Sequence, residues 1–154
     1  MKTKRQTNIG SERIIEIYTD TESKNITDNS AKELYDHFRL SDFFPNNSLQ
    51  IIGMINLGYP IIQRKGRNDI YAITSVKRDD QPIFIADNCD SLNYILDLIE
   101  NAWKGKVETD WLTKTDENKR IKSETLSKIS QISPQIDLSF WDWIAFRELS
   151  ISLS

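Results

Sequence analysis

The stretch that most constrains the fold of this chain runs from Asn88 to Gly105, where apolar residues recur at intervals of three and four. In a helix such residues share one face, and here they are Leu92, Ile95, Leu96, Ile99, Ala102 and Trp103. Tyr94 and Leu98 widen this face, which suits a helix packed broadly on a sheet. Asn88 or Asp90 can cap the first turn, and Gly105 can adopt the left-handed conformation that ends a helix. We therefore expect one long amphipathic helix.

Short β-rich runs precede this helix at a spacing of about ten residues. They are Leu49–Ile55, Tyr59–Lys65, Ile70–Val76 and Ile83–Ala86. Because parallel strands need long crossover connections, this spacing predicts an antiparallel meander. Gly53 interrupts the first run and predicts a bulge or a close backbone approach. Pro60 has no N–H to donate, so the second run is expected to be an edge strand or to begin at Ile61.

Helical patterns lie on both sides of this central part. Ser30 and Glu33 match a capping box and predict an N-terminal helix that ends near Pro45. Residues 118–132 carry a moderate helical pattern before Pro134. The expected fold class is therefore α+β, with an antiparallel meander sheet of about four strands packed by N-terminal, central and C-terminal helices.

Two segments fit more than one structure. Arg13–Tyr18 is too short to distinguish a strand from a helical turn. In the aromatic-rich stretch that follows Gln135, the alternation of Ile136, Leu138 and Phe140 fits a strand. The spacing of the later apolar residues fits a helix that begins at Phe140, and we favour this helix.

Length and composition fit one soluble domain. The 154 residues predict a single α+β domain at 12–154, preceded by a flexible N-terminal tail at 1–11 that is almost wholly polar. The single cysteine, Cys89, excludes an intramolecular disulfide and favours a reducing compartment. No apolar run approaches the roughly 20 residues that cross a bilayer. No apolar segment follows the basic first residues, so they do not form a secretory signal. We expect a cytoplasmic protein that does not contact membranes.

No sequence motif in this chain indicates catalysis or cofactor binding. Glycine-rich phosphate loops and the serine elbow are absent, and the chain has one cysteine and one histidine where zinc sites use several. Cys89 and His37 could formally act as nucleophile and base, but single residues far apart in sequence are ordinary background. We therefore expect no catalytic residues, no metal and no cofactor, with a Cys89-dependent enzyme as one alternative.

Basic residues gather at the ends of neighbouring predicted strands, close to Tyr59 and Tyr71. They are Arg64, Lys65, Arg67, Lys77 and Arg78. Basic side chains beside stackable rings can hold single-stranded nucleic acid. Lys and Arg at strand ends also protect sheet edges from aggregation, and the net charge of −3 disfavours a dedicated nucleic-acid binder. A nucleic-acid-associated accessory protein is therefore the alternative, ranked below protein binding.

Aromatic and acidic residues provide candidate contacts for a protein partner. On a helix, Trp141 and Trp143 lie about 200° apart, so they cannot both face the core. Trp111 stands among polar residues, and exposed tryptophans are common at protein–protein hot spots, although most tryptophans are core residues. The partner-binding residues that we predict are Asp79, Asp80, Asp110, Trp111 and Trp141.

The segment Ile83–Ile99 reads as a last core strand, a short Ala-Asp step and a helix that begins on a small or acidic residue. Together with the capped helix and the meander before it, this segment resembles the SUKH superfamily, whose members have a mixed α/β fold. The resemblance implies an immunity protein, or antitoxin, that neutralises a bacterial toxin by binding it. It implies no catalytic residues. An acidic protein would complement a basic nuclease toxin, because complementary potentials speed association.

Overall fold

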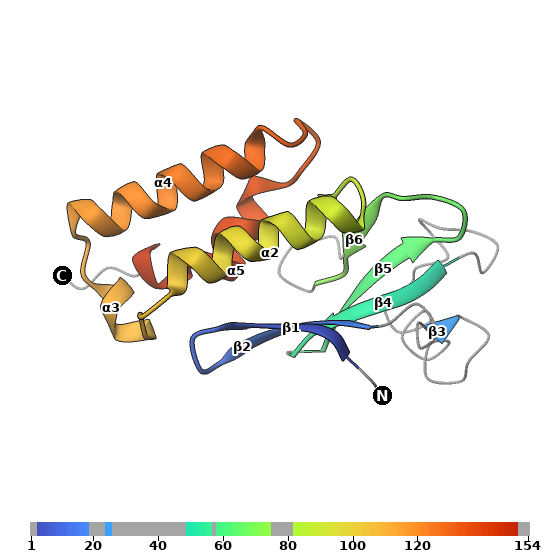
Figure 1. The fold of residues 1–154 in the computed structure, drawn as a ribbon, viewed down its shortest axis with the longest axis horizontal. Coiled ribbons are helices and arrows are strands. Elements are labelled where there is room, and N and C mark those ends of the chain that lie inside the picture. The colour runs from blue at the N-terminus through green and yellow to red at the C-terminus, as the bar shows by residue number, and fades with distance from the viewer. Residues whose placement is uncertain (1–2, 19–23, 26–48, 57, 75–81, 151–154) are drawn as a thin grey trace.

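The computed structural model describes residues 3–18, 24–25, 49–56, 58–74 and 82–150, which form an α+β fold (Figure 1). The strands are β1 (Thr3–Ile9), β2 (Arg13–Tyr18), β3 (Lys24–Asn25), β4 (Leu49–Ile55), β5 (Tyr59–Arg64), β6 (Ile70–Ala72) and β7 (Ile83–Ala86). The helices are α2 (Cys89–Trp103), α3 (Glu108–Leu112), α4 (Asp116–Ser130) and α5 (Leu138–Ser150). Helix α2 contacts both β1 and β7, and it therefore spans the sheet.

One antiparallel sheet has the strand order β1-β2-β4-β5-β6-β7, and the short β3 pairs with β4 beside this path. The antiparallel arrangement of β4 to β7 confirms the predicted meander. Our count of about four strands was too low, because β1 and β2 extend the same sheet. The open choice at Arg13–Tyr18 is resolved as a strand, paired on one side with β1 and on the other with β4.

We expected residues 1–11 to be a flexible tail, and this is wrong for Thr3–Ile9, which pairs along β2 as strand β1. The side chains of β1 alternate, so that Thr7 and Ile9 are buried whereas Lys4, Gln6 and Asn8 are exposed. The polar composition concealed the strand. Arg5 and Thr7 turn toward α2, where their polar groups bond to carboxylates at 2.6 and 2.8 Å.

Of the predictions for Gly53 and Pro60, the structure confirms the first and contradicts the second. The register shifts between Ile51 and Gly53, and a Cβ atom at Gly53 would lie 2.4 Å from the Glu16 carbonyl oxygen, which confirms both the bulge and the close approach. The expectation for Pro60 is wrong, because β5 lies between β4 and β6 and includes this residue. Pro60 stands where the β6 ladder ends, and its carbonyl accepts a hydrogen bond from the Ile73 N–H at 3.0 Å.

The helices begin at residues that cap them. The Asn88 side chain accepts a hydrogen bond from the Ser91 N–H at 2.8 Å and caps α2 as predicted. Helix α5 confirms the favoured helix near residue 140, although it starts at Leu138 and its cap is Asp137, which accepts from the Phe140 N–H at 3.0 Å. The predicted N-terminal helix lies outside the described residues.

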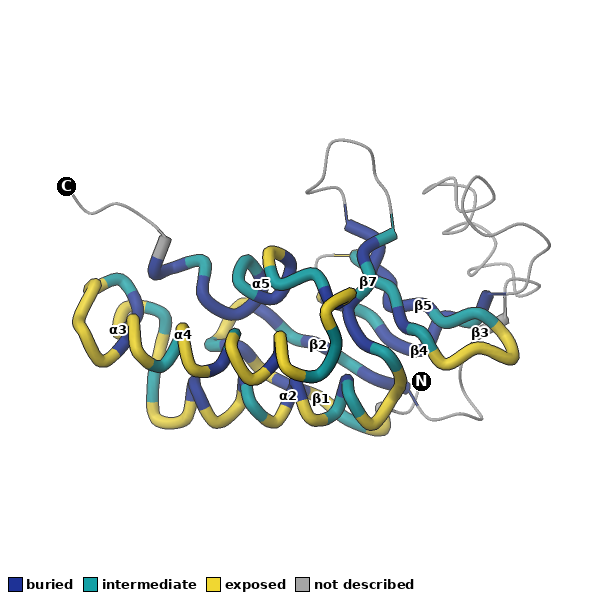
Figure 2. The backbone as a smooth tube through the Cα atoms, turned by 90° about the horizontal axis from the view of Figure 1, so that it is seen from above, coloured by how far each residue is buried: buried dark blue, intermediate teal, exposed yellow. Residues whose placement is uncertain are grey.

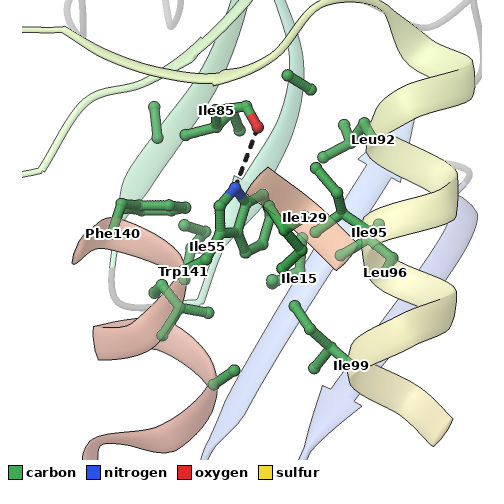
Figure 3. Close-up of a cluster of buried hydrophobic side chains, with 14 of the residues drawn as sticks. Ile15, Ile55, Ile85, Leu92, Ile95, Leu96, Ile99, Ile129, Phe140 and Trp141 are labelled. Carbon is green, nitrogen blue, oxygen red and sulfur yellow. Dashed lines mark hydrogen bonds between the residues drawn. The ribbon is translucent and has the colours of Figure 1, made fainter. Parts of the chain in front are cut away.

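The larger of two hydrophobic cores among the described residues joins the sheet to α2, α3, α4 and α5. Figure 3 shows Trp141 of α5 among isoleucines of the sheet and of α4, with its indole Nε1 donating a hydrogen bond to the Ile85 carbonyl at 3.0 Å. The predicted apolar face of α2 is buried in this core, whereas turns of α2 and α4 also carry exposed residues (Figure 2). The solvent-facing residues of α2 therefore lie on a helix whose opposite face is packed in the core.

Candidate protein-binding surface

The two tryptophans that we predicted as partner contacts are core residues. Trp111 is 0% exposed, and its ring centroid lies 5.3 Å from those of both Trp103 and Phe146. Trp141 is 1% exposed. Both predictions are therefore wrong. We expected Trp111 to be exposed because its sequence neighbours are polar. These neighbours face solvent, but the short helix α3 turns the Trp111 ring inward.

We expected that Trp141 and Trp143 cannot both face the core, and this holds only in part: Trp141 is buried in the core, whereas Trp143 is more exposed but still packs against it. Its ring centroid lies 6.3 Å from that of Tyr59 and 5.7 Å from the Arg147 guanidinium carbon. Trp143 is half-buried by these neighbours. It therefore packs on the protein itself and is a weak candidate for a partner contact.

Of the predicted acidic contacts, Asp110 is exposed, and it also has a structural role. Its carboxylate accepts a hydrogen bond from the Val107 N–H at 2.8 Å and so caps the start of α3. Asp79 and Asp80 lie outside the described residues.

The basic cluster predicted for nucleic-acid binding is partly neutralised within the protein. Arg64 pairs with Asp69 at 2.7 Å, and Arg67 lies 3.6 Å from the same carboxylate. The hydrogen bond to Asp69 raises the pKa of Arg64. Lys65 is exposed, whereas Lys77 and Arg78 lie outside the described residues.

Cys89 is exposed in the first turn of α2 and forms no disulfide. His37, the base that the alternative enzyme would need, lies outside the described residues. The Cys89-dependent enzyme thus stays an alternative based on sequence alone.

The outer face of α2 carries an exposed aromatic residue between carboxylates. Asp90, Tyr94, Asp97 and Asn101 are all exposed and follow one another at intervals of four, three and four. This spacing places them in one line along the helix, which we call the α2 stripe. Tyr94 is 45% exposed, one of the two large apolar side chains that stand out from the described surface. The stripe thus combines a ring able to enter a pocket with negative charge on either side.

Arg5 of β1 holds part of this face in place. Its guanidinium lies 2.6 Å from the Asp97 carboxylate and 3.1 Å from that of Glu100, and it donates a hydrogen bond to the Asn93 carbonyl at 3.0 Å. These contacts orient the carboxylates of Asp97 and Glu100 and cancel part of their charge; of the two, Asp97 belongs to the α2 stripe. Asp90, at the other end, forms no ion pair with the described residues, so its charge remains available to a partner.

Sequence reasoning missed Tyr94 because we placed it on the widened apolar face of the helix. Its position does carry a usable signal. Tyr94 lies four residues after Asp90 and three before Asp97, so it shares their side of the helix and lies away from the line through Leu92, Ile95 and Ile99. An aromatic residue in a polar line of a helix is a reasonable marker of a contact surface.

Within the described part of the chain, no helix combines the length and the apolar character that crossing a membrane requires. A comparison with known proteins found no matching family, no matching curated protein and no matching solved structure.

Proposed function

We propose that this protein acts without catalysis, by binding another protein through the α2 stripe. We further propose that the partner is a basic bacterial toxin, so that the protein is an immunity protein, or antitoxin, of the cytoplasm. The resemblance of Ile83–Ile99 to the SUKH superfamily supports the second step. The proposed mechanism is direct occlusion of a toxin surface.

The observation that carries the proposal is the exposure of Tyr94 on the outer face of α2. Tyrosine offers a large, rigid contact area with few rotatable bonds, and it is enriched among the residues that dominate binding energy. A mobile anchor would lose conformational entropy on binding. Helix α2 buries its opposite face in the core, so this cost is small for Tyr94.

Charge supports the choice of a basic partner. Asp90 and Asp97 flank Tyr94, and the whole chain carries a net charge of −3. Acidic groups around a central ring attract a positive surface and speed its encounter, while the ring supplies affinity in the desolvated centre. A nuclease toxin presents positive charge to its phosphate substrate, which makes it a partner of the required sign.

A neutralisation assay tests the proposal. The chain is co-expressed in a bacterial host with the product of the reading frame next to its own gene, and cell growth is measured. We expect the wild-type chain to restore growth that the neighbouring product inhibits, and Tyr94→Ala to restore less. Glu117→Gln is the control, because it removes one exposed carboxylate from α4 and leaves the α2 stripe unchanged. Protection by Tyr94→Ala equal to that by the wild type would contradict the proposed surface.

Nucleic-acid binding stays a separate prediction. A fluorescence titration with a single-stranded oligonucleotide at low salt tests it, since phosphate contacts are strongest there. The pairing of Arg64 and Arg67 with Asp69 leads us to expect weak binding that physiological salt abolishes.

A further inference from the structure

A long groove between α4 and α5 has a different chemistry from the α2 stripe. It has a volume of about 780 Å³. Helix α4 contributes Lys119, Lys122, Leu126 and Ser130, among other residues, and these positions follow the three- and four-residue spacing of one helix face. From Lys119 to Ser130 the face extends about 17 Å at 1.5 Å per residue. The groove is thus about as long as three turns of a helix.

The floor of the groove is apolar. Leu126 of α4 and Leu138 and Leu149 of α5 line it, with Leu126 and Leu138 only partly buried. Ser123 and Ser127 of α4 also line the groove, and their small side chains let another backbone approach closely. Two partly exposed leucines beside a buried one, in a concave surface, can accept the apolar face of an amphipathic helix.

The charges along the groove all have one sign. The charged side chains among its described lining residues are Lys114, Lys119 and Lys122. Lys122 pairs with Asp142 at 3.1 Å, whereas Lys114 and Lys119 are exposed and form no ion pair with the described residues. These two lysines stand toward the α3 end of the groove, in a protein whose net charge is negative. The groove therefore favours an occupant with acidic residues beside an apolar face.

We propose that this groove is a second docking site, which binds an acidic amphipathic helix of a partner protein. The leucines of that helix lie on Leu126, Leu138 and Leu149, and its carboxylates meet Lys114 and Lys119. The occupant is about three turns long, and its acidic end lies toward α3. This site is independent of the α2 stripe, which is acidic and lies on another helix.

A peptide-binding measurement tests the proposal. The probe is a fluorescein-labelled peptide of about 15 residues. Its leucines recur at helical spacing, and its glutamates lie beside the apolar face that these leucines form. Its anisotropy is measured with the full chain at low salt. A matched peptide with glutamine in place of glutamate is expected to bind at least about tenfold more weakly, because it lacks the charges that the lysines attract. Equal binding of the two peptides, or no binding of the acidic peptide, would overturn the proposal.

Substitutions at residues that line the groove test whether the acidic peptide binds there. Lys114→Glu combined with Lys119→Glu is expected to weaken binding at least about tenfold. Ser127→Trp fills the groove from an exposed position, so folding is retained while binding is lost. The matched control compares two single variants, Lys119→Glu and Lys128→Glu, which make the same charge change on α4, whereas only Lys119 lines the groove. Unchanged binding by the Ser127→Trp variant would place the peptide elsewhere and contradict the proposal.

The oligomeric state tests whether a second copy of this chain, and not a partner helix, occupies the groove. Light scattering on the wild-type chain is expected to give the mass of a monomer. A dimer that Ser127→Trp dissociates would show that the groove joins two copies of this chain, and this result would overturn the proposed partner helix.

Discussion

The indole Nε1 of Trp103 donates a hydrogen bond to the carbonyl oxygen of Ala145 at 2.8 Å, and this contact ties the end of α2 to a kink in α5. The kink is at Phe146, whose φ of −132° and ψ of 21° are not helical. The guanidinium of Arg13 donates to the neighbouring carbonyl, that of Ile144. Trp103 of α2 and Arg13 of β2 thus supply side-chain donors to the two carbonyls that directly precede the kink.

Trp103→Phe tests the first of these donors. The substitution keeps an aromatic ring but leaves the Ala145 carbonyl without its side-chain donor, so we expect the free energy of unfolding to fall by about 1–3 kcal/mol. Chemical denaturation measures the change. Trp143→Phe removes an indole N–H that has no hydrogen bond to the described residues, and it is expected to cost less. An equal loss in both variants would show that ring volume, and not the hydrogen bond, sets the effect.

The buried ion pair between Arg13 and Glu148 gives a second prediction. Arg13 is 1% exposed and Glu148 is 7% exposed, and they join the start of β2 to the end of α5. Arg13→Met leaves a buried carboxylate without its partner, so we expect a loss of about 3–5 kcal/mol. The double variant Arg13→Met/Glu148→Leu removes both charges and is expected to be more stable than Arg13→Met alone. A double variant that is less stable than Arg13→Met would contradict this account.

Glu108 predicts a dependence of stability on pH. The N–H and Oγ of Ser11, in the turn between β1 and β2, both donate hydrogen bonds to its carboxylate, and they lower the pKa of Glu108. A carboxylate with a lowered pKa stabilises the fold above its unfolded pKa, and this contribution is lost as pH falls through the folded pKa. Glu108→Gln should therefore be less stable than the wild type at neutral pH. We expect this difference in stability between Glu108→Gln and the wild type to shrink as the pH falls to about 3, which is below the ordinary Glu pKa. Thermal unfolding at several pH values measures it, and a constant difference would contradict the role of the charge.

Gly53→Ala tests the close approach of β4 to β2. The added Cβ would lie 2.4 Å from the Glu16 carbonyl oxygen and 3.1 Å from the Ile17 Cδ1 atom. The strands must separate to accept it, so we expect a loss of about 1–3 kcal/mol in the free energy of unfolding. Chemical denaturation that shows no loss would mean that the bulge can shift without cost.

The local elements could be predicted from the sequence where side-chain patterns are strong. Helix α2 has a continuous apolar line and a capping residue, Asn88, and both are where we expected them. Strand β1 was missed because Arg5 and Thr7 make it look polar, and their partners lie on α2, far away in sequence. A pattern within one segment does not reveal contacts that only the folded chain brings together.

The candidate surface was missed for a related reason, although the helical spacing of Tyr94 with Asp90 and Asp97 could have indicated it. Trp111 is surrounded by polar residues in the sequence, yet Trp103 and Phe146 enclose it in space. Tyr94 is surrounded by apolar residues in the sequence, yet it stands on the outer line of α2. In both cases the direction of one side chain on its helix decided exposure, and neighbours in the sequence were a poor guide to it.

Titration calorimetry with the product of the neighbouring reading frame gives the dissociation constant of the proposed complex and shows whether the α2 stripe is its binding surface. We expect saturable binding by the wild type and by Glu117→Gln, and an affinity reduced at least about tenfold by Tyr94→Ala, which corresponds to about 1.4 kcal/mol. Equal affinity of Tyr94→Ala and the wild type would contradict the claim that the α2 stripe is the binding surface. The absence of binding by the wild type would contradict the proposed partner.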